Sequence, residues 1–377
     1  MITRFYVDNY KCLVNFEYKP SSFELILGAN GAGKSTVFEA LGCVLDFVLE
    51  QKKAFDFFSW KTLTRWQRRK KMIFALEIED KGKKYDYELT LDVDDDGVFS
   101  MLSSEVLKLN GKTIINSELT IEEFGHGANG ESINMFMDIA VDSGSQIRIF
   151  RAADVERSTL GYYGQEFKEL LKSIIPVKMN PSSVSAVLKK SEERPTRNFD
   201  NFPAYYFHLL QEKQTLIIDL ISVLRENVDG FRAFALEGRG PEARQLRVEF
   251  AVEGGEKGQT IRYDFSELSD GQRALIALYT LAFCESGSTL LIDEPENFIS
   301  SRELQPWLML LRERIEDFGG QAIIISHHPE FINVLAPQDA IQFRRKDGGP
   351  VMIRPFEIGP YQGLTPAEIV ARGWENE

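Results

Sequence analysis

The sequence is poor in cysteine and in long apolar segments. Only three of its 377 residues are cysteines, Cys12, Cys43 and Cys284, and their spacing matches neither a metal-ligand motif nor a disulfide framework. The longest apolar stretch, residues 274–284, is too short to cross a bilayer, and the first residues lack a secretory-signal pattern. We therefore expect a cytoplasmic protein that works in a reducing compartment and does not enter a membrane.

Positive charge is also scarce. The chain has 44 lysines and arginines against 57 aspartates and glutamates, a net charge of −13, which argues against a general, unassisted affinity for nucleic-acid phosphates. Residues 61–71 are an exception. This basic segment contains Lys61, Arg65, Arg68, Arg69, Lys70 and Lys71, interleaved with Trp60 and Trp66. It either contacts nucleic acid or forms a solvated surface, and a shorter basic stretch follows at residues 344–346.

A glycine-rich motif stands near the amino terminus. An apolar strand at residues 24–27 runs directly into the pattern GxxxxGK[ST] at residues 28–35, and a helical pattern follows. In such a Walker A loop, successive N–H groups face the β-phosphate, Lys34 reaches the β- and γ-oxygens, and the Ser35 hydroxyl ligates Mg²⁺. The predicted nucleotide-binding residues are Asn30, Gly31, Ala32, Gly33, Lys34, Ser35 and Thr36.

Two linked motifs lie far downstream. Residues 268–272 read LSDGQ and open an apolar helical run, and an apolar strand at residues 289–292 then ends in Asp293 and Glu294. Alone, the first motif is also an ordinary helix start, because Ser and Asp are favoured N-caps. Together the motifs are typical of an ATPase signature followed by Walker B, in which Asp293 holds Mg²⁺ through water and Glu294 polarises the attacking water.

A third apolar strand, residues 323–325, ends in Ser326, His327 and His328. A histidine at the end of such a strand can donate a hydrogen bond to a γ-phosphate, whereas a histidine in an arbitrary loop usually has no such role. The predicted catalytic residues are therefore Lys34, Glu294 and His327.

These motifs resemble the ABC-class ATPase heads of the RecF, SMC and OLD type. Asp293-Glu294-Pro295-Glu296-Asn297, together with residues 326–331, looks most like the soluble bacterial AAA and OLD-like ATPases of phage-defence systems. The resemblance implies that ATP and Mg²⁺ are the cofactors and that two heads form a homodimer or a higher oligomer that sandwiches two ATP molecules. It further implies that Ser269, Gly271 and Gln272 of one subunit face the nucleotide held by Lys34 of another.

The sequence departs from this family pattern in two places. A transporter-like D-loop would place Asp where Ser300 stands, and no glutamine of the Q-loop type is obvious, Gln146 being the nearest candidate. The stretch after His327 is too short for the nuclease domain that OLD proteins carry, which favours a separate effector protein, a nuclease or a toxin. The alternatives are a RecF-like repair ATPase that binds DNA ends or junctions, and an ATP-gated assembly scaffold with little turnover.

The pattern along the chain predicts an α/β P-loop NTPase of ABC-head type, with a mixed sheet, an antiparallel β-layer and an added helical lobe. Residues 2–7 and 13–18 read as strands whose sheet the Walker A strand continues, and residues 72–115 alternate like antiparallel strands with a hairpin at Asn110-Gly111. Residues 161–234 read as helical, including one helix from Phe207 to Leu224. The predicted domains are residues 1–160, 161–260 and 261–377.

Overall fold

The computed structural model divides the chain into two compact units. Unit 1 contains residues 1–21, 28–172 and 341–355, and unit 2 contains residues 22–27, 173–340 and 356–377. The residues that the structure describes are 1–50, 54–93, 100–123, 133–141, 146–149, 164–240, 242–252, 254, 258–357 and 363–373. Each unit combines segments that are distant in sequence, and the three consecutive domains of the sequence analysis stay a prediction.

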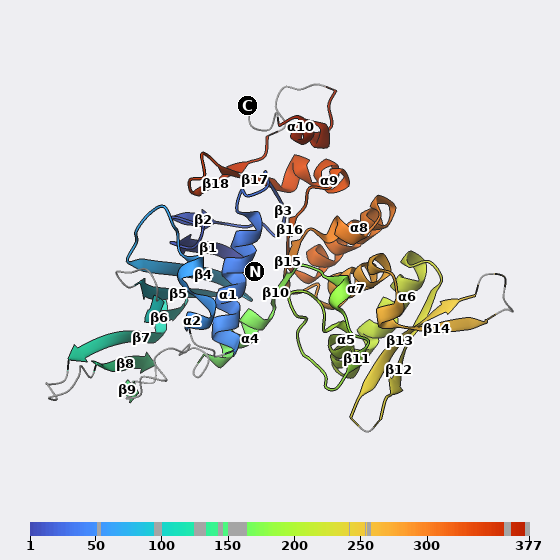
Figure 1. Ribbon diagram of the computed structural model, residues 1–377, viewed down its shortest axis with the longest axis horizontal. Coiled ribbons are helices and arrows are strands. Elements are labelled where there is room, and N and C mark those ends of the chain that lie inside the picture. Colours follow the sequence, from blue (N-terminus) through green and yellow to red (C-terminus); the bar gives the residue numbers. More distant parts are fainter. Residues whose placement is uncertain are drawn as a thin grey trace. The chain divides into compact units, whose positions relative to one another are not determined.

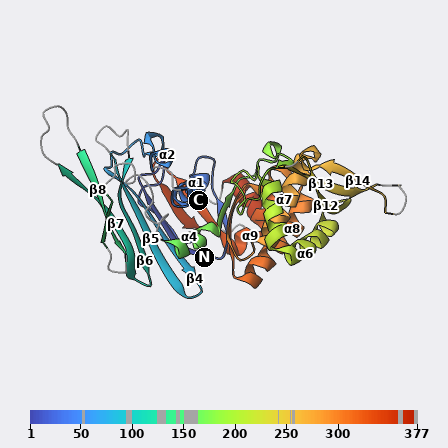
Figure 2. The ribbon, with the colours of Figure 1, turned by 90° about the horizontal axis from the view of Figure 1, so that it is seen from below.

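Unit 1 is built on a large antiparallel sheet in the order β2-β1-β4-β5-β6-β7-β8-β9, whose long strands lie side by side in Figure 2. The strands are β1 (Ile2–Asp8), β2 (Phe16–Tyr18), β4 (Lys71–Asp80), β5 (Lys83–Val93), β6 (Ser100–Leu109), β7 (Lys112–Glu123), β8 (Ile133–Val141) and β9 (Gln146–Ile149). The predicted hairpin at Asn110 and Gly111 is confirmed, since both residues have positive φ, 51° and 78°, as a tight two-residue turn requires.

The remaining elements of unit 1 are α1 (Lys34–Glu50), α2 (Ala54–Phe57), η1 (Trp60–Thr62), α4 (Gln165–Lys172) and the hairpin of β17 (Ala340–Arg345) and β18 (Val351–Pro355). Helix α1 buries an apolar stripe that includes Val37, Leu41, Val44 and Val48. Helix α4 packs on the sheet through Phe167, whose ring lies 5.6 Å from that of Tyr85.

Unit 2 contains four parallel strands in the order β10-β15-β16-β3. They are β3 (Phe23–Leu27), β10 (Ile174–Val177), β15 (Thr289–Asp293) and β16 (Gln321–Ile325). Every residue of β3, β15 and β16 is buried, as expected for parallel strands that are covered on both faces. Because these strands are parallel, Asp293 and Ile325 reach the same carboxyl edge of the sheet.

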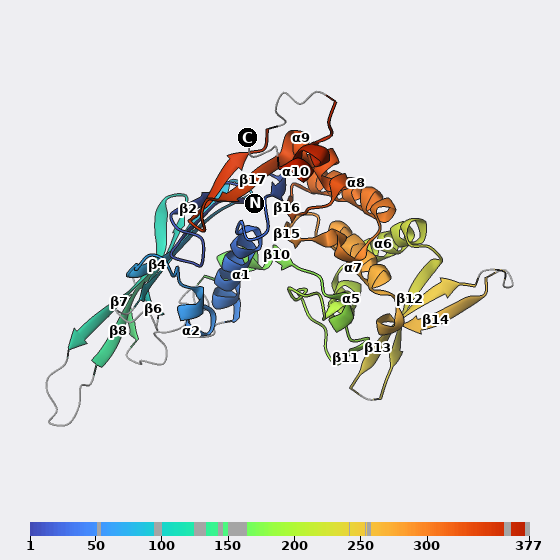
Figure 3. The same cartoon turned by 45° about the horizontal axis from the view of Figure 1, so that its top comes forward.

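Helices and a second sheet complete unit 2 (Figure 1). The helices are α5 (Phe202–Glu212), α6 (Gln214–Asn227), α7 (Asp270–Cys284), α8 (Ser301–Phe318), α9 (Pro329–Asp339) and α10 (Pro366–Arg372), with short turns η2 (Pro181–Ser183), η3 (Phe265–Glu267) and η4 (Pro295–Phe298). The second sheet pairs β11 (Val187–Leu188), β12 (Phe231–Gly238), β13 (Arg244–Ala251) and β14 (Thr260–Asp264). Figure 3 shows α10 beside α9, and the Ala367 N–H donates to Asn333 Oδ1 at 3.0 Å.

Three predictions about these elements were wrong. The Walker A strand, β3, does not continue the sheet of β1 and β2 but pairs with β16, because local alternation cannot identify a partner 300 residues away. The single helix from Phe207 to Leu224 is two helices that meet at Lys213, whose ammonium binds the Cys284 carbonyl and the Glu285 carboxylate. Residues 161–234 also contain a strand, β10. Its Pro176 is tolerated because β10 is an edge strand of the parallel sheet.

The fold class is confirmed. The described chain has a mixed α/β fold, with an antiparallel layer in unit 1, a parallel sheet in unit 2 and added helices. Among the described residues, no helix combines the length and the apolar content needed to cross a membrane.

Candidate nucleotide-binding and hydrolysis site

The Walker A loop joins β3 to α1, and its glycines adopt backbone angles that other residues avoid. Gly28, Gly31 and Gly33 have φ values of 144°, 81° and 98°. Packing requires two of them as well: a Cβ on Gly28 would lie 2.3 Å from the Phe343 carbonyl oxygen, and one on Gly33 would lie 2.5 Å from a methyl group of Val351. The hairpin β17–β18 thus closely supports the loop within unit 1.

Lys34, the first residue of α1, is almost fully buried in this loop. Its ammonium donates to the carbonyl oxygens of Gly28 at 2.6 Å and Ala29 at 3.2 Å. Asn30 and Gly31 are exposed, whereas Ser35 and Thr36 in the first turn of α1 are half-buried. The buried ammonium and the helix N-terminus both favour an anion at this loop.

A second cation approaches the loop from β17. Arg345 donates to the Gly31 carbonyl at 3.2 Å, and its guanidinium lies 5.6 Å from the centre of the Trp66 ring. Arg345 belongs to the shorter basic stretch, and Trp66 belongs to the basic segment 61–71. The two basic stretches that the sequence separates by almost 300 residues therefore meet beside the Walker A loop in unit 1.

In unit 2, β15 carries the Walker B carboxylates to the carboxyl edge of the parallel sheet. The side chain of Asp293 is only 2% exposed. Its Oδ2 accepts a hydrogen bond, but its buried Oδ1 has no hydrogen-bond partner within the described chain. An unsatisfied buried carboxylate oxygen is costly, and it fits a residue that completes its contacts with hydrated Mg²⁺.

Glu294 turns the chain away from the sheet edge with a left-handed backbone, φ 52° and ψ 58°. Its N–H donates to the Ile325 carbonyl at 2.8 Å, and its carboxylate accepts a hydrogen bond from Asn297 at 3.1 Å. Non-glycine residues in this conformation concentrate at functional sites. The turn leaves the Glu294 side chain about one-third exposed, next to the buried Asp293.

The groups around Glu294 stabilise the negative charge of its carboxylate. Partial burial acts to raise the pKa of its carboxyl group. The hydrogen bond from Asn297 and the charges of Lys178 and His327 outweigh burial, so the pKa lies below its usual value. Glu294 is therefore ionised at neutral pH, as a group that polarises water must be.

The sequence analysis missed Lys178. This residue follows β10, and its ammonium lies 3.0 Å from Asp293 Oδ2 and 3.6 Å from Glu294 Oε2. Burial disfavours its charged form, but the hydrogen bond and charge of Asp293, with the charge of Glu294, raise the pKa of Lys178 overall. Only the parallel pairing of β10 with β15 reveals the residue, since no motif surrounds it in the sequence.

The two histidines after β16 have different surroundings. His328 caps α9: its Nδ1 accepts from the Glu330 N–H at 3.2 Å, so its Nε2 carries the proton and donates to Ser301 Oγ at 3.1 Å. His327 is exposed, and its N–H donates to Glu296 Oε1 at 3.0 Å. Of these two histidines, His327 is therefore the exposed one, and its charge helps to lower the pKa of Glu294.

The signature motif forms the start of α7. Ser269 is the N-cap, and it exchanges hydrogen bonds with Gln272 in a capping box. Packing also requires a glycine at position 271, because a Cβ there would lie 2.8 Å from the Phe298 carbonyl oxygen at the end of η4. The ordinary helix-start interpretation of this motif is therefore satisfied, and it is compatible with an exposed anion site at the same helix end.

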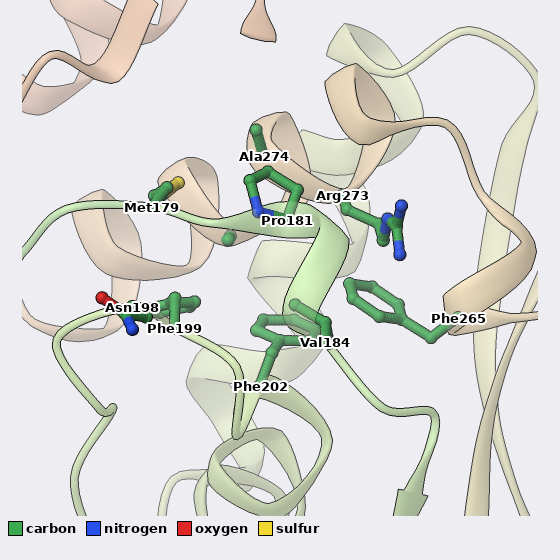
Figure 4. Close-up of a pocket in the computed structure, with 10 residues that line it drawn as sticks. Met179, Pro181, Val184, Asn198, Phe199, Phe202, Phe265, Arg273 and Ala274 are labelled. Atoms are coloured by element: carbon green, nitrogen blue, oxygen red, sulfur yellow. The ribbon is translucent and has the colours of Figure 1, made fainter. Parts of the chain in front are cut away.

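The start of α7 also contacts the segment that follows Lys178. Ser182 Oγ donates to Asp270 Oδ2 at 3.0 Å. Figure 4 shows an apolar pocket at this place, lined by Met179, Pro181 and Val184, by Arg273 and Ala274 of α7, and by the rings of Phe199, Phe202 and Phe265. Within unit 2, the residues that follow Lys178 and the signature helix α7 therefore line the same pocket.

The two departures from the family pattern have structural settings. Ser300 is the N-cap of α8 and forms a capping box with Glu303. Gln146 is the first residue of β9, and its side chain lies outside the described part of the chain.

The Walker A residues belong to unit 1, whereas the Walker B carboxylates, His327 and the signature belong to unit 2.

A P-loop that enters a helix, a Walker B strand in a parallel sheet and a capped LSxGQ helix define an ATPase head of the ABC and SMC type. A model of the family described as "AAA domain, putative AbiEii toxin, Type IV TA system" matches residues 25–333, and the chain belongs to this family. The matched range contains the Walker A loop, the signature, Walker B and His327. This match confirms the ATPase-head resemblance.

Two further comparisons were made. Curated proteins give no significant match. Among solved structures, the chain is similar to the SMC head domain from Thermotoga maritima, with 15% sequence identity, a TM-score of 0.46, and coverage of 95% of this chain and 99% of that chain.

Proposed function

We propose that the protein binds ATP with Mg²⁺, hydrolyses it slowly, and dimerises on ATP to control a partner effector. The observation that carries this proposal is the Walker B edge: a buried Asp293 with an unsatisfied oxygen stands beside an ionised, partly exposed Glu294. In this proposal Lys34 binds the phosphates, Ser35 and Asp293 hold Mg²⁺, Glu294 polarises water, and His327 donates to the γ-phosphate.

The nucleotide would lie between two copies of the chain. Asn30, Gly31, Ala32, Gly33 and Thr36 would complete the phosphate loop of one copy, and Ser269, Gly271 and Gln272 of the other copy would face the γ-phosphate. The start of α7, where Ser269 is exposed and the next three residues are half-buried, supports this role, since N-terminal N–H groups favour an anion. The Mg²⁺, when bound, would neutralise the charge that develops on the phosphates.

The partner is proposed to be a separate nuclease or toxin in bacterial defence against phage. The family description, which names a putative toxin of a type IV toxin–antitoxin system, supports a role beside another protein. A scaffold that assembles on ATP with little turnover is the alternative, and it differs from the proposal in releasing no phosphate.

A DNA-binding repair ATPase is a second candidate, and one observation favours it. Arg345 stacks on Trp66, so the two basic stretches form one cationic region beside the Walker A loop of a chain that is otherwise acidic. A cationic region with an exposed aromatic ring is suited to a nucleic-acid backbone.

Two substitutions test the hydrolysis proposal. Glu294→Gln should retain ATP binding and lose hydrolysis, with a loss on the order of 10²-fold or more, because it removes a charge but keeps the side-chain size. Lys34→Ala should lose nucleotide affinity itself. Phosphate release and binding of a fluorescent ATP analogue measure the two effects, and Glu330→Gln, a carboxylate change in the first turn of α9, is the control that should retain both. Phosphate release from the Glu294→Gln protein at the parent rate would contradict the assignment.

A further inference from the structure

The pairing of β10 with β15 places a lysine where the metal is proposed to bind. Val177 is in register with Ile292, so the next residues along the two strands, Lys178 and Asp293, meet at the carboxyl edge of the sheet. The Lys178 ammonium binds Asp293 Oδ2 at 3.0 Å and lies 3.6 Å from Glu294 Oε2. One cation therefore faces both Walker B carboxylates.

The two partners differ in their freedom to move. The Asp293 side chain is 2% exposed, whereas that of Lys178 is 45% exposed. The backbone of Lys178 is held by its N–H, which donates to the Arg197 carbonyl at 2.8 Å, but its ammonium is carried on a flexible four-carbon stem. If the contact breaks, the lysine can move into water, and the carboxylate stays where it is.

The contact is also incomplete from the side of Asp293. Oδ2 has the ammonium, but Oδ1 has no hydrogen-bond partner in the described structure. A single ammonium satisfies only part of a buried carboxylate, whereas a hydrated divalent cation can satisfy both oxygens through its bound waters.

We propose that Lys178 is a positioning residue that competes with the divalent cation for Asp293, and that Mg²⁺ arriving with the nucleotide displaces it. The inference rests on the proposed role of Asp293 as a metal ligand. An ammonium and a metal ion carry the same sign and face the same carboxylate, so the presence of one weakens the binding of the other. Lys178 thereby compensates the charges of Asp293 and Glu294 while no metal is bound, and the free metal is disfavoured until the nucleotide phosphates contribute to its binding.

Manganese binding to the nucleotide-free, full-length protein tests this competition. Mn²⁺ alone is titrated, and the free ion is followed by electron paramagnetic resonance. Lys178→Gln should bind Mn²⁺ at least about tenfold more tightly than the parent, because a competing charge beside the ligand is removed. Lys178→Arg, which retains the charge, should stay close to the parent.

Lys213→Gln is the matched control. Lys213 belongs to the same unit and binds Glu285 at 2.9 Å with a similarly exposed side chain, 35%, but it lies at the other end of α7 from the signature. This variant should leave Mn²⁺ affinity unchanged. Unchanged or weaker binding in Lys178→Gln, or equal tightening in Lys213→Gln, would overturn the competition.

A double variant separates this inference from the proposed function. Adding Asp293→Asn to Lys178→Gln should abolish the gained Mn²⁺ affinity, since the ligand is then missing. If tight binding persisted in the double variant, the metal would be held elsewhere, and the metal role of Asp293 would fail together with the competition. If Asp293→Asn removed metal binding but Lys178→Gln changed nothing, only the competition would fail.

Discussion

At the scale of single residues, the backbone places the adjacent carboxylates of Asp293 and Glu294 in different surroundings, one buried and one partly exposed. Asp293 ends a buried parallel strand and is covered, and Glu294 takes a left-handed conformation that turns its side chain outward. The strain of that conformation is offset by the hydrogen bond from the Glu294 N–H to the Ile325 carbonyl. One residue is thus suited to hold a metal ion and the next to contact water.

Gly271 shows that one residue can serve packing and the proposed site together. Gly271→Ala would place a Cβ 2.8 Å from the Phe298 carbonyl, and we expect it to destabilise the fold by about 1–3 kcal/mol, since η4 cannot keep its position against α7. The midpoint of urea unfolding, followed by circular dichroism, measures the change.

Gly238→Ala is the control for this prediction. Gly238 ends β12 in the same unit, and a Cβ there meets no atom within 4 Å. We expect its unfolding midpoint to stay near that of the parent. Equal midpoints for the Gly271→Ala protein and the parent would show that η4 yields, and the packing explanation would then be wrong.

At the scale of elements, the start of α7 has a capping box of its own and contacts two other segments of unit 2. The capping box fixes Ser269, η4 packs on Gly271, and η2 binds Asp270 through Ser182. Segment η4 follows Walker B and η2 follows Lys178, so both of these contacting segments come directly from the carboxyl edge of the parallel sheet.

The basic segment of unit 1 contains cations with different functions. Arg69 binds Asp8, whose side chain is nearly buried, so this arginine supports the fold. Arg68 is exposed. Arg68→Glu should weaken binding to a labelled DNA duplex and lower the slope of log affinity against log salt by about one, because one phosphate contact is lost. Fluorescence anisotropy at several salt concentrations measures both quantities.

Arg302→Glu is the matched charge reversal, at an exposed position in the first turn of α8 in unit 2. It changes the net charge by the same amount and should leave DNA binding close to that of the parent. Equal effects of the two reversals would indicate a response to net charge alone. An unchanged Arg68→Glu protein at low salt would favour the solvated-surface interpretation of the segment.

At the scale of the whole molecule, the proposed dimer makes each chain supply halves of two different sites. Lys34→Ala and Ser269→Arg should each be inactive alone. Mixed together, they should regain part of the activity, because one of the two composite sites then contains both intact halves. The Glu294→Gln protein should also be larger on a sizing column with ATP than without it, since the γ-phosphate stabilises the closed pair.

Loss of the helix cap has to be separated from loss of the shared site. Ser269→Arg also removes a capping box, a change that costs about 1 kcal/mol. Thr365→Arg removes the same kind of capping box from α10 and should retain activity. A protein of constant size with and without ATP, together with inactive mixtures, would contradict the ATP-driven sandwich.

Local sequence patterns predicted those features of the protein that depend only on residues close together in the sequence. The glycine spacing of residues 28–33 predicted the phosphate loop, and the Asn110-Gly111 pair predicted a hairpin. Each of these features follows from backbone angles or hydrogen bonds within a few residues, so the sequence suffices to predict them.

Tertiary structure decided which strands are neighbours, and hence which distant charges meet. Strand β3 pairs with β16 rather than with β1 and β2, Arg345 reaches Trp66, and Lys178 reaches Asp293 across 115 residues. Strand register depends on burial of both faces of the sheet and on the connections between strands, which no local pattern contains. The sequence by itself therefore determined the positions of the nucleotide motifs, and the fold alone placed Lys178 beside the proposed metal ligand.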